Sequence, residues 1–521
     1  MSCMDFRWGE YRLYWGDGHL NVHGKDIWYP ELTWERLERI FEAAKSHLDF
    51  LPIAYYPFIW YEKNGLIIES CGHRDKFLDE WALIQEAVAK MNSPGTFVTF
   101  LGYEWHGNRR RYGDHNVYYL KDYMPLDASE TLPELYEHLR ENQGIAIPHH
   151  TAYQVGERGK DWSFHDDDLS PFVEIYSSHG SSEGCDTPFT LNRNMDMGPR
   201  TSGGTVIEGL ERGYRLGITA SGDNHWDFAG VWGNGLMAVY AKELTRESIW
   251  DAFMNRRIYG VTGDRIKLKF SINDHMMGEV FKYEGPVEVK AEIIGCHIID
   301  KIEIIKNGDV VYAYCHQGRW RLPTDKGVVR VKIRIECGWG PQERFGVKVS
   351  KPKVWSMSLE VVDGKLISVE PCFTDFGQRI ISTSDSLCEW IFTTKPKSIQ
   401  GMIFEVESPL KGIINIEIDH KTYRFTLEEL LKRGMVIALK EEAMRMISQQ
   451  FNLSPEDIEN PDVYWHHAWK VKVHRAIPQE AYHVKIRFKD KSLRDGRNYY
   501  YLRVTQANGQ MAWSSPIWID K

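Results

Sequence analysis

Two kinds of hydrophobic pattern follow one another along the chain. In the first part, apolar runs of strand length lie at residues 11–15, 48–54, 97–103, 115–120, 144–148, 172–176 and 214–220. Apolar residues between them recur with helical spacing, which predicts helices over 33–47, 75–91, 131–143, 205–212 and 245–256. Thr33 fits an N-cap, and Gly144 fits the position just past a helix end. Strands that alternate with helices imply a parallel sheet, in either a barrel or a doubly wound fold.

From about residue 266 the pattern changes to strict alternation with turn signals, as in "VEVKAEII" and "VRVKIRIE". The pair Asn307-Gly308 predicts a hairpin turn. Helical spacing returns at 426–433 and at about 439–451. We therefore expect an α/β domain over 1–265, followed by a mainly β, sandwich-like region over 266–521 with a helical insertion around 426–460.

Composition and charge narrow the class of protein. The 521 residues are 42% hydrophobic and 13% aromatic, enough for two or three globular domains. A net charge of -9 leaves no electrostatic footprint for nucleic acid or an anionic membrane, apart from the short run Arg109 to Arg111. The eight cysteines form no C-x-x-C pair, and no apolar segment reaches the ~20 residues of a membrane span. We expect a cytoplasmic protein without nucleic-acid or membrane partners.

Histidine and carboxylate side chains gather at the ends of the predicted strands. They are His19, Glu104, His115, His149, His150, Asp223 and His225. The carboxyl ends of barrel strands converge on one rim, so these distant residues are predicted to meet there. Imidazole and carboxylate suit zinc, manganese or iron(II), and a carboxylate such as Glu104 can bridge two ions. A single histidine at a strand end is more commonly structural, but the whole set favours a metal site.

Several of these stretches resemble successive motifs of the PHP (polymerase and histidinol phosphatase) superfamily of metal-dependent hydrolases. They are "YWGDGH" at 14–19, "LDFLPIAYY" at 48–56, "FLGYEW" at 100–105, "GDHNVY" at 113–118, "IPHH" at 147–150 and "SGDNH" at 221–225. Residues 243–266 resemble, more narrowly, a bacterial branch of that superfamily. The resemblance implies a distorted (β/α)7, TIM-like barrel of the PHP type, with two or three metal ions at its rim and hydrolysis of phosphate esters.

The resemblance also implies metal ligands. They are His19, Glu104, His115, His149, Asp223 and His225, with His149 preferred to His150 because it comes directly off its strand. Two departures from the family pattern stand out. Asn21 replaces the second histidine of the His-x-His motif, and Tyr55 and Tyr56 replace an Asp-His pair. Asn21 could still bind a metal through its carbonyl oxygen, and His23 could act as a replacement nitrogen ligand. The loss of family ligands predicts one or two ions rather than three.

The expected function is that of a metal-dependent hydrolase, a phosphoesterase that uses a metal-activated water and zinc, manganese or iron. Catalytic roles are expected for Glu104, Asp223 and His150. Substrate contacts are expected from Arg109, His106, His179, Glu183 and Tyr56. The expected substrate is a small or sugar-linked anionic molecule, and the oligomeric state stays open. Two alternatives remain: a non-catalytic protein that binds a carbohydrate or a partner through a degenerate site, and a hydrolase of non-phosphate esters or amides.

Overall fold

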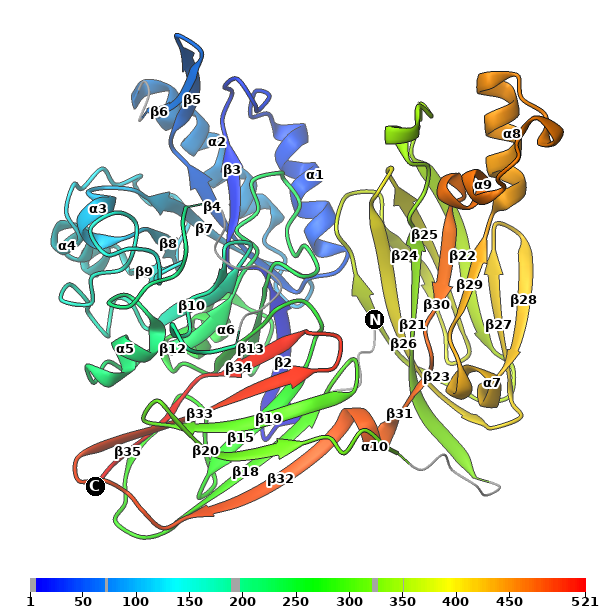
Figure 1. Cartoon of the computed structure of the whole chain (residues 1–521). Coiled ribbons are helices and arrows are strands. Elements are labelled where there is room, and N and C mark those ends of the chain that lie inside the picture. Colours follow the sequence, from blue (N-terminus) through cyan, green and yellow to red (C-terminus); the bar gives the residue numbers. More distant parts are fainter. Residues whose placement is uncertain (1–5, 71–73, 189–196, 321–326, 350) are drawn as a thin grey trace. The chain divides into compact units, whose positions relative to one another are not determined.

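The computed structural model describes residues 6–70, 74–188, 197–320, 327–349 and 351–521 (Figure 1). These residues form two compact units. The larger unit takes in the described residues up to Gly295, then Ile299–His316 and His483–Lys521, and the smaller unit takes in Cys296–Ile298 and Gln317–Tyr482. The boundary expected near residue 265 thus falls inside the larger unit, because strands on both sides of it belong to one sheet.

The framework of the larger unit is an open sheet with the strand order β17-β35-β33-β34-β14-β13-β2-β4-β7-β8-β9. Its N-terminal strands are β2 (Tyr11–Gly16), β4 (Phe50–Tyr56), β7 (Val98–Trp105), β8 (His115–Tyr119), β9 (Gly144–Pro148), β13 (Leu236–Ala241) and β14 (Ile258–Val261). Its later strands are β17 (Val280–Lys282), β33 (Arg497–Gln506), β34 (Met511–Ser514) and β35 (Ile517–Asp520). The end of the chain therefore completes the sheet that its beginning starts.

Strand direction differs from the expected all-parallel arrangement. β2, β4 and β7 run parallel, but β8 is antiparallel to both β7 and β9, because only a short link joins β7 to β8. The strands β10 (Phe172–Ser177), β11 (Gly180–Ser181) and β12 (Gly217–Ala220) form a separate sheet. Among the described strands, no hydrogen-bonded ladder joins β9 to β10 or β12 to β13. The described fold is mixed α/β and rich in sheet, and it is not the closed barrel that we expected.

The longer helices of the larger unit connect its strands. They are α1 (Trp34–Lys45), α2 (Arg74–Met91), α4 (Leu132–Asn142), α5 (Val206–Glu211) and α6 (Arg246–Met254). Of these, α1, α2, α4 and α6 contact this sheet. The Thr33 side chain accepts from the Arg36 N–H at the start of α1, as predicted. Helix α4 ends instead at Gln143 in the left-handed region, with φ of 53°. Gly144 already begins β9, where a Cβ would lie 2.5 Å from Leu139 Cδ2, so close packing rather than a helix end requires this glycine.

The predicted hairpin turn is present between β19 (Ile299–Lys306) and β20 (Asp309–Cys315). Asn307 and Gly308 both have positive φ, at 49° and 84°, which suits the right-handed twist of the two strands. β19 also pairs with β33, so this hairpin belongs to the larger unit.

The smaller unit is a β-sandwich. One sheet has the strands β21 (Val328–Gly338), β23 (Lys365–Cys372), β26 (Ile399–Pro409), β29 (Met435–Ala438), β30 (Lys470–Val473) and β31 (Ile477–Pro478). The other has β22 (Lys353–Val361), β24 (Arg379–Thr383), β25 (Leu387–Thr394), β27 (Ile413–Ile418) and β28 (Lys421–Thr426). Their inner faces meet at Trp390 and Phe404, whose ring centroids lie 5.0 Å apart. The two helical interruptions are α7 (Leu427–Lys432) and α8 (Lys440–Phe451), followed by α9 (Asp462–His467).

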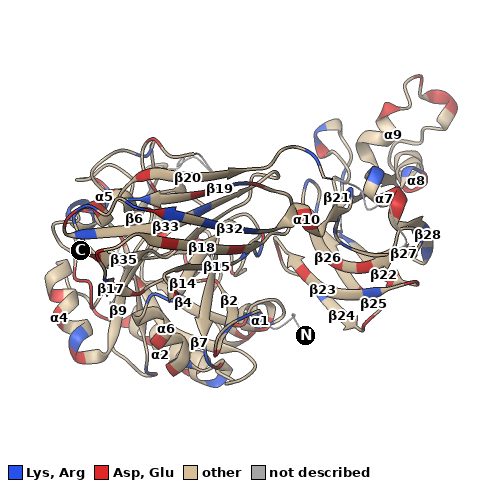
Figure 2. Cartoon of the chain, turned by 90° about the horizontal axis from the view of Figure 1, so that it is seen from below, with Lys and Arg blue, Asp and Glu red and all other residues tan. Residues whose placement is uncertain are grey.

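Acidic and basic residues are interspersed along the chain rather than collected on one element (Figure 2). None of the helices in the described ranges combines the length and the apolar character that crossing a bilayer requires.

Candidate metal centre

A buried carboxylate ties the first strand-end loop to the last. Asp17 Oδ1 accepts from the backbone N–H of His19 at 3.0 Å and of Gly222 at 2.7 Å, and Oδ2 accepts from the N–H of Gly230 at 2.7 Å. Burial raises the pKa of Asp17 to about 6, although these N–H groups favour the ionised form. These contacts bring His19 next to Asp223, although the two residues are far apart in the sequence.

The short strand β3 (Leu20–His23) places the next side chains of this stretch. It pairs in parallel with β4, so that Asn21 lies opposite Ala54 and His23 opposite Tyr56. Asp17, His19, Asn21 and His23 are all 0% exposed. The stretch has no apolar run of its own, and the surrounding strands and loops bury it.

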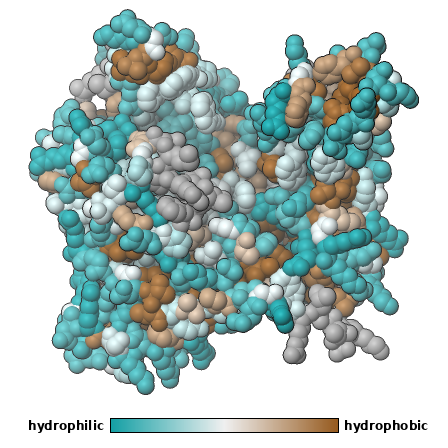
Figure 3. Space-filling model, viewed as in Figure 1, coloured by the Kyte–Doolittle hydropathy of each residue, from teal (hydrophilic) through white to brown (hydrophobic). Residues whose placement is uncertain are grey.

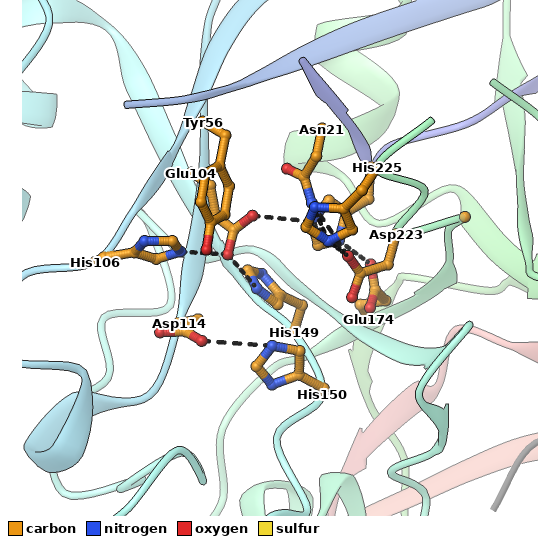
Figure 4. A network of polar contacts seen from close by, with 12 residues as sticks. Asn21, Tyr56, Glu104, His106, Asp114, His149, His150, Glu174, Asp223 and His225 are labelled. Atoms are coloured by element: carbon orange, nitrogen blue, oxygen red, sulfur yellow. Dashed lines mark hydrogen bonds and ion pairs between the residues drawn. The ribbon is translucent and has the colours of Figure 1, made fainter. Parts of the chain in front are cut away.

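The carboxylates of Glu104, Glu174 and Asp223 lie close together at the centre (Figure 4), and each of them contacts His19. Its Nδ1 lies 3.0 Å from Glu174 Oε2, and its Nε2 lies 3.5 Å from both Glu104 Oε2 and Asp223 Oδ1. Burial disfavours the imidazolium, but Asp223 and Glu174 outweigh it and hold the pKa of His19 well above its ordinary value. This concentration of buried negative charge stabilises a cation at His19.

Glu104, in β7, joins His19 to a second group of donors. Its Oε2 faces His19, while its Oε1 contacts His106 Nε2 and lies 3.4 Å from His149 Nε2. Burial favours the neutral acid, yet the neighbouring His106 and the contacts with His149 and His19 hold the pKa of Glu104 well below its ordinary value. Glu104 is therefore a buried carboxylate with one oxygen turned to each group, as a bridging ligand requires.

The third part of the centre contains His150, His179 and Asp114. His150 Nε2 lies 3.4 Å from Asp114 Oδ2, and His179 Nε2 lies 3.1 Å from Asp223 Oδ2. Burial favours the neutral form of Asp114, but the guanidinium groups of Arg109, at 2.9 Å, and Arg158, at 2.5 Å, outweigh it. They lower the pKa of Asp114 below its ordinary value.

His150 and Asp223 have positive φ, at 32° and 50°. Residues other than glycine seldom adopt this conformation, and it collects at functional sites.

The donor atoms form overlapping groups that return to their starting point. The groups are His19 with Glu104 and His149; Asp114 with His149 and His150; His150 with His179 and Asp223; and His19 with Glu174 and Asp223. A fifth group joins Glu104, His106 and Asp114, and in every group the ligand atoms lie within 4.8 Å of one another.

Several buried nitrogen and oxygen atoms that could bind a metal have no hydrogen-bond partner among the described residues. They are Asn21 Oδ1, His149 Nδ1 and Glu174 Oε1. Because a buried polar atom without a partner is costly, these unused lone pairs fit a site that holds divalent ions.

Three expected ligands lie outside these groups. His115 Nε2 lies 3.1 Å from the buried Lys160 Nζ, and burial followed by Lys160 lowers the pKa of His115 well below its ordinary value. His23 Nε2 lies 2.8 Å from His225 Nδ1, and the other nitrogen of His225, Nε2, lies 3.3 Å from Asp223 Oδ1. In the described part of the chain, none of the groups of three donors includes His23, His115 or His225.

The adjacent tyrosines Tyr55 and Tyr56 face carboxylates. Tyr55 OH donates to Glu80 Oε2 at 2.7 Å and Tyr56 OH donates to Glu69 Oε1. Burial, followed by Glu104 and Glu69, raises the pKa of Tyr56 well above its ordinary value, so the phenol stays neutral. Tyr56 nevertheless lies at the centre, with its ring 4.5 Å from that of His23 and 4.8 Å from that of His106.

The expected substrate residues separate into two sets. His106, His179, Tyr56 and Arg109 lie at the centre, and Arg109 Nη2 is buried with no hydrogen-bond partner among the described residues. Arg110 and Arg111 are exposed. Glu183 lies elsewhere: it accepts from Tyr501 OH and Arg503 Nη1 at 2.8 Å and from Trp513 Nε1 at 3.0 Å. Its role is to anchor the C-terminal strands, so its assignment as a substrate residue is corrected.

Sequence reasoning missed three carboxylates of the centre. Glu174 is the one charged residue in the run "FVEIY", and a buried charge inside a strand is a signal that could have found it. Asp17 and Asp114 lie in "WGDGH" and "GDHNV", next to histidines that were selected. Their roles depend on contacts with distant loops and arginines, and the residues next to them in the sequence do not reveal these contacts.

Parts of the chain are similar to known proteins. Residues 210–291 match the model of a family described as a protein of unknown function, DUF3604, and this match includes Asp223 and His225. An uncharacterised protein of Chlamydia pneumoniae is 30% identical over 258 residues, and one of Chlamydia muridarum is 27% identical over 257 residues. Each alignment covers 45% of this chain and 41% of the relative, so the match spans about two fifths of the length of these relatives.

One solved structure is also similar. It is a two-domain protein from Bacteroides vulgatus that contains a predicted PHP-like metal-dependent phosphoesterase, at 13% identity and a TM-score of 0.33. The alignment covers 81% of this chain and 96% of that one.

Proposed function

We propose that the larger unit is a metal-dependent phosphoesterase with one or two divalent ions, related to the PHP superfamily through an opened form of its barrel. The observation that carries this proposal is the closed series of buried donor groups around His19, Glu104, His149 and Asp223. His19, Glu174, Asp223 and one oxygen of Glu104 would hold a first ion. The other oxygen of Glu104, with His149, would hold a second.

A divalent ion in such a site lowers the pKa of water and stabilises charge that develops on a phosphoryl oxygen. The side chains of the chain then supply binding and proton handling. Arg109 offers its unpartnered Nη2 to an anionic oxygen, while its Nε stays on Asp114 at 2.9 Å. His179 presents Nε2 to Asp223 and Nδ1 to Tyr153 OH at 2.9 Å. We assign His179 and His150 to proton transfer beside Asp223, since both imidazoles adjoin that carboxylate.

The geometry also bears on the number of ions. The Tyr55 and Tyr56 hydroxyls donate to Glu80 and Glu69, and His23 Nε2 faces His225 Nδ1. We therefore propose at most two ions. The proposal includes a small anionic substrate.

Elemental analysis of the purified chain, combined with a screen of phosphate mono- and diesters, tests the proposal. We expect about one or two ions of zinc, manganese or iron per chain, and turnover that a chelator abolishes. Glu104→Gln should lower both metal content and turnover, because it removes the charge between the two groups. Arg110→Gln, whose side chain is 72% exposed, is the matched control. A chain that binds none of these metals after reconstitution contradicts the proposal.

A further inference from the structure

An aromatic surface begins at the His23–His225 pair. Tyr29 stacks on His23, with ring centroids 3.9 Å apart and an angle of 7° between the planes. Trp226 follows His225 in the chain, and its ring lies 5.4 Å from that of Tyr29. Tyr29 is 8% exposed and Trp226 is 67% exposed. A stacked pair of rings and a tilted third ring therefore lead from the side of the metal centre out to solvent.

Two more tryptophans extend this surface and are held in place by one carboxylate. Trp28 and Trp60, the latter in β5 (Ile59–Lys63), have ring centroids 5.2 Å apart. Asp26 accepts from the backbone N–H of Trp28 at 2.7 Å, of Tyr29 at 2.9 Å and of Trp60 at 3.1 Å. We call Trp28, Tyr29, Trp60 and Trp226 the aromatic rim. Its members come from three separate segments that hydrogen bonds and ring contacts hold together.

The exposure of the aromatic rim needs an explanation, because large aromatic side chains normally bury most of their surface. Trp28 and the preceding Ile27 are 50% and 47% exposed, and Leu66, in the strand paired with that of Trp60, is 65% exposed. Hydrophobic residues accordingly show at the surface of the end of the larger unit where β5 and β6 (Leu66–Ser70) lie (Figure 3). A contiguous exposed apolar surface on a folded unit marks a place where something binds.

Charge around the aromatic rim limits what binds there. Asp26 is used by three backbone N–H groups, and Asp227 is paired with Arg36 at 2.8 Å and with Arg39 at 3.5 Å. The rim thus offers apolar ring faces and no unpaired charged group among these residues. A protein partner of ordinary affinity needs about 800 Å² on each side, more than four aromatic side chains supply. A single neutral ring with apolar faces fits better.

We propose that the aromatic rim binds the sugar ring of a phosphorylated carbohydrate whose phosphate lies at the metal centre. A sugar ring offers C–H groups to an indole face and hydroxyl groups to water, which suits tryptophans that are half exposed. This inference rests on the proposed phosphoesterase function for the position of the phosphate. The sugar subsite itself is separate from the metal ligands.

Binding of neutral sugars tests the subsite without any turnover. The full chain is titrated with methyl glucoside and cellobiose, with tryptophan fluorescence and ligand-observed NMR as readouts. We expect weak binding that Trp226→Ala and Trp28→Ala each reduce by about tenfold, the size of one ring contact. Trp465→Ala, a tryptophan of the smaller unit that is 43% exposed, should leave it unchanged. Absence of binding, an equal loss in Trp465→Ala, or binding of adenosine in place of both sugars overturns the proposal.

Turnover supplies the second measurement. Glucose 6-phosphate and glycerol 3-phosphate carry the same phosphate on a ring and on an open chain. Trp226→Ala should lower kcat/KM for the ring substrate about tenfold relative to the open-chain substrate. An equal effect on both substrates contradicts the subsite. If the unmodified chain hydrolyses neither of these nor any other phosphate ester of the screen, the phosphoesterase proposal fails, and the sugar titration still decides whether the aromatic rim binds carbohydrate.

Discussion

Replacement of Arg36 by methionine is expected to destabilise the larger unit strongly. Arg36, in the first turn of α1, donates from Nε and Nη2 to Asp227 at 2.8 Å each. Its Nη1 donates to the backbone carbonyls of His23 at 2.9 Å and Pro30 at 2.8 Å. The side chains of Arg36 and Asp227 are 6% and 11% exposed. One guanidinium thus joins a helix, the end of β3 and the loop that follows His225.

The magnitude follows from what the substitution leaves behind. Removing one partner of a buried ion pair costs about 3–5 kcal/mol, because the other charge stays buried. The lower end applies, since Arg39 remains 3.5 Å from Asp227. The buried carbonyl of His23 loses its donor and adds about 1 kcal/mol, whereas the contact with the Pro30 carbonyl is only partly buried. Arg36→Met should therefore lower the free energy of unfolding by about 4 kcal/mol.

Urea denaturation of the metal-free chain measures this loss, because chelation removes the contribution of bound ions to stability. Arg39→Gln is the matched control, since its side chain is 61% exposed and contacts the same carboxylate. It should cost less than about 1 kcal/mol. Equal effects of the two substitutions, or a cost below about 1 kcal/mol for Arg36→Met, would refute the assignment of Arg36 as the buried anchor of these segments.

Three further predictions concern separate residues. Glu183→Gln should cost about 3 kcal/mol in unfolding free energy, because Arg503 loses one of its two buried carboxylate partners and keeps only Glu303, and it should leave metal content unchanged in elemental analysis; loss of metal would return Glu183 to the centre. Burial, then Arg265, lowers the pKa of His47 to about 4, so the native state binds this proton less readily than the unfolded chain. The contribution of His47 to the free energy of unfolding should be intact above about pH 6.5 and fall by roughly 3 kcal/mol towards pH 4. In His47→Gln, the urea midpoint should fall less steeply as the pH is lowered than in the unmodified chain. Asn21→Ala should weaken metal binding about tenfold in competition titrations, whereas His23→Ala should not, since His23 Nε2 faces His225; the reverse order would make His23 a ligand.

Local signals in the sequence determined much of the secondary structure. Thr33 caps α1, Leu37, Ile40, Phe41 and Ala44 form its buried face, and Asn307-Gly308 turns the β19–β20 hairpin. These signals succeed because caps, helical faces and tight turns depend on residues within one or two turns of each other. The chemical types of the donors were equally visible, since imidazole and carboxylate at strand ends are readable without coordinates.

Contacts between distant segments decided the rest. The antiparallel direction of β8, the return of the final strands to the first sheet and the place of Glu183 beside Arg503 all involve partners far along the chain. Contacts between distant segments also determine the metal centre. Glu174 in β10 contacts His19, and Lys160 Nζ lies next to His115 Nε2. A side chain's type sets which interactions it can make. Burial and the neighbours that folding supplies decide which of them it makes, because an unpaired buried charge lowers the free energy of unfolding of the whole unit.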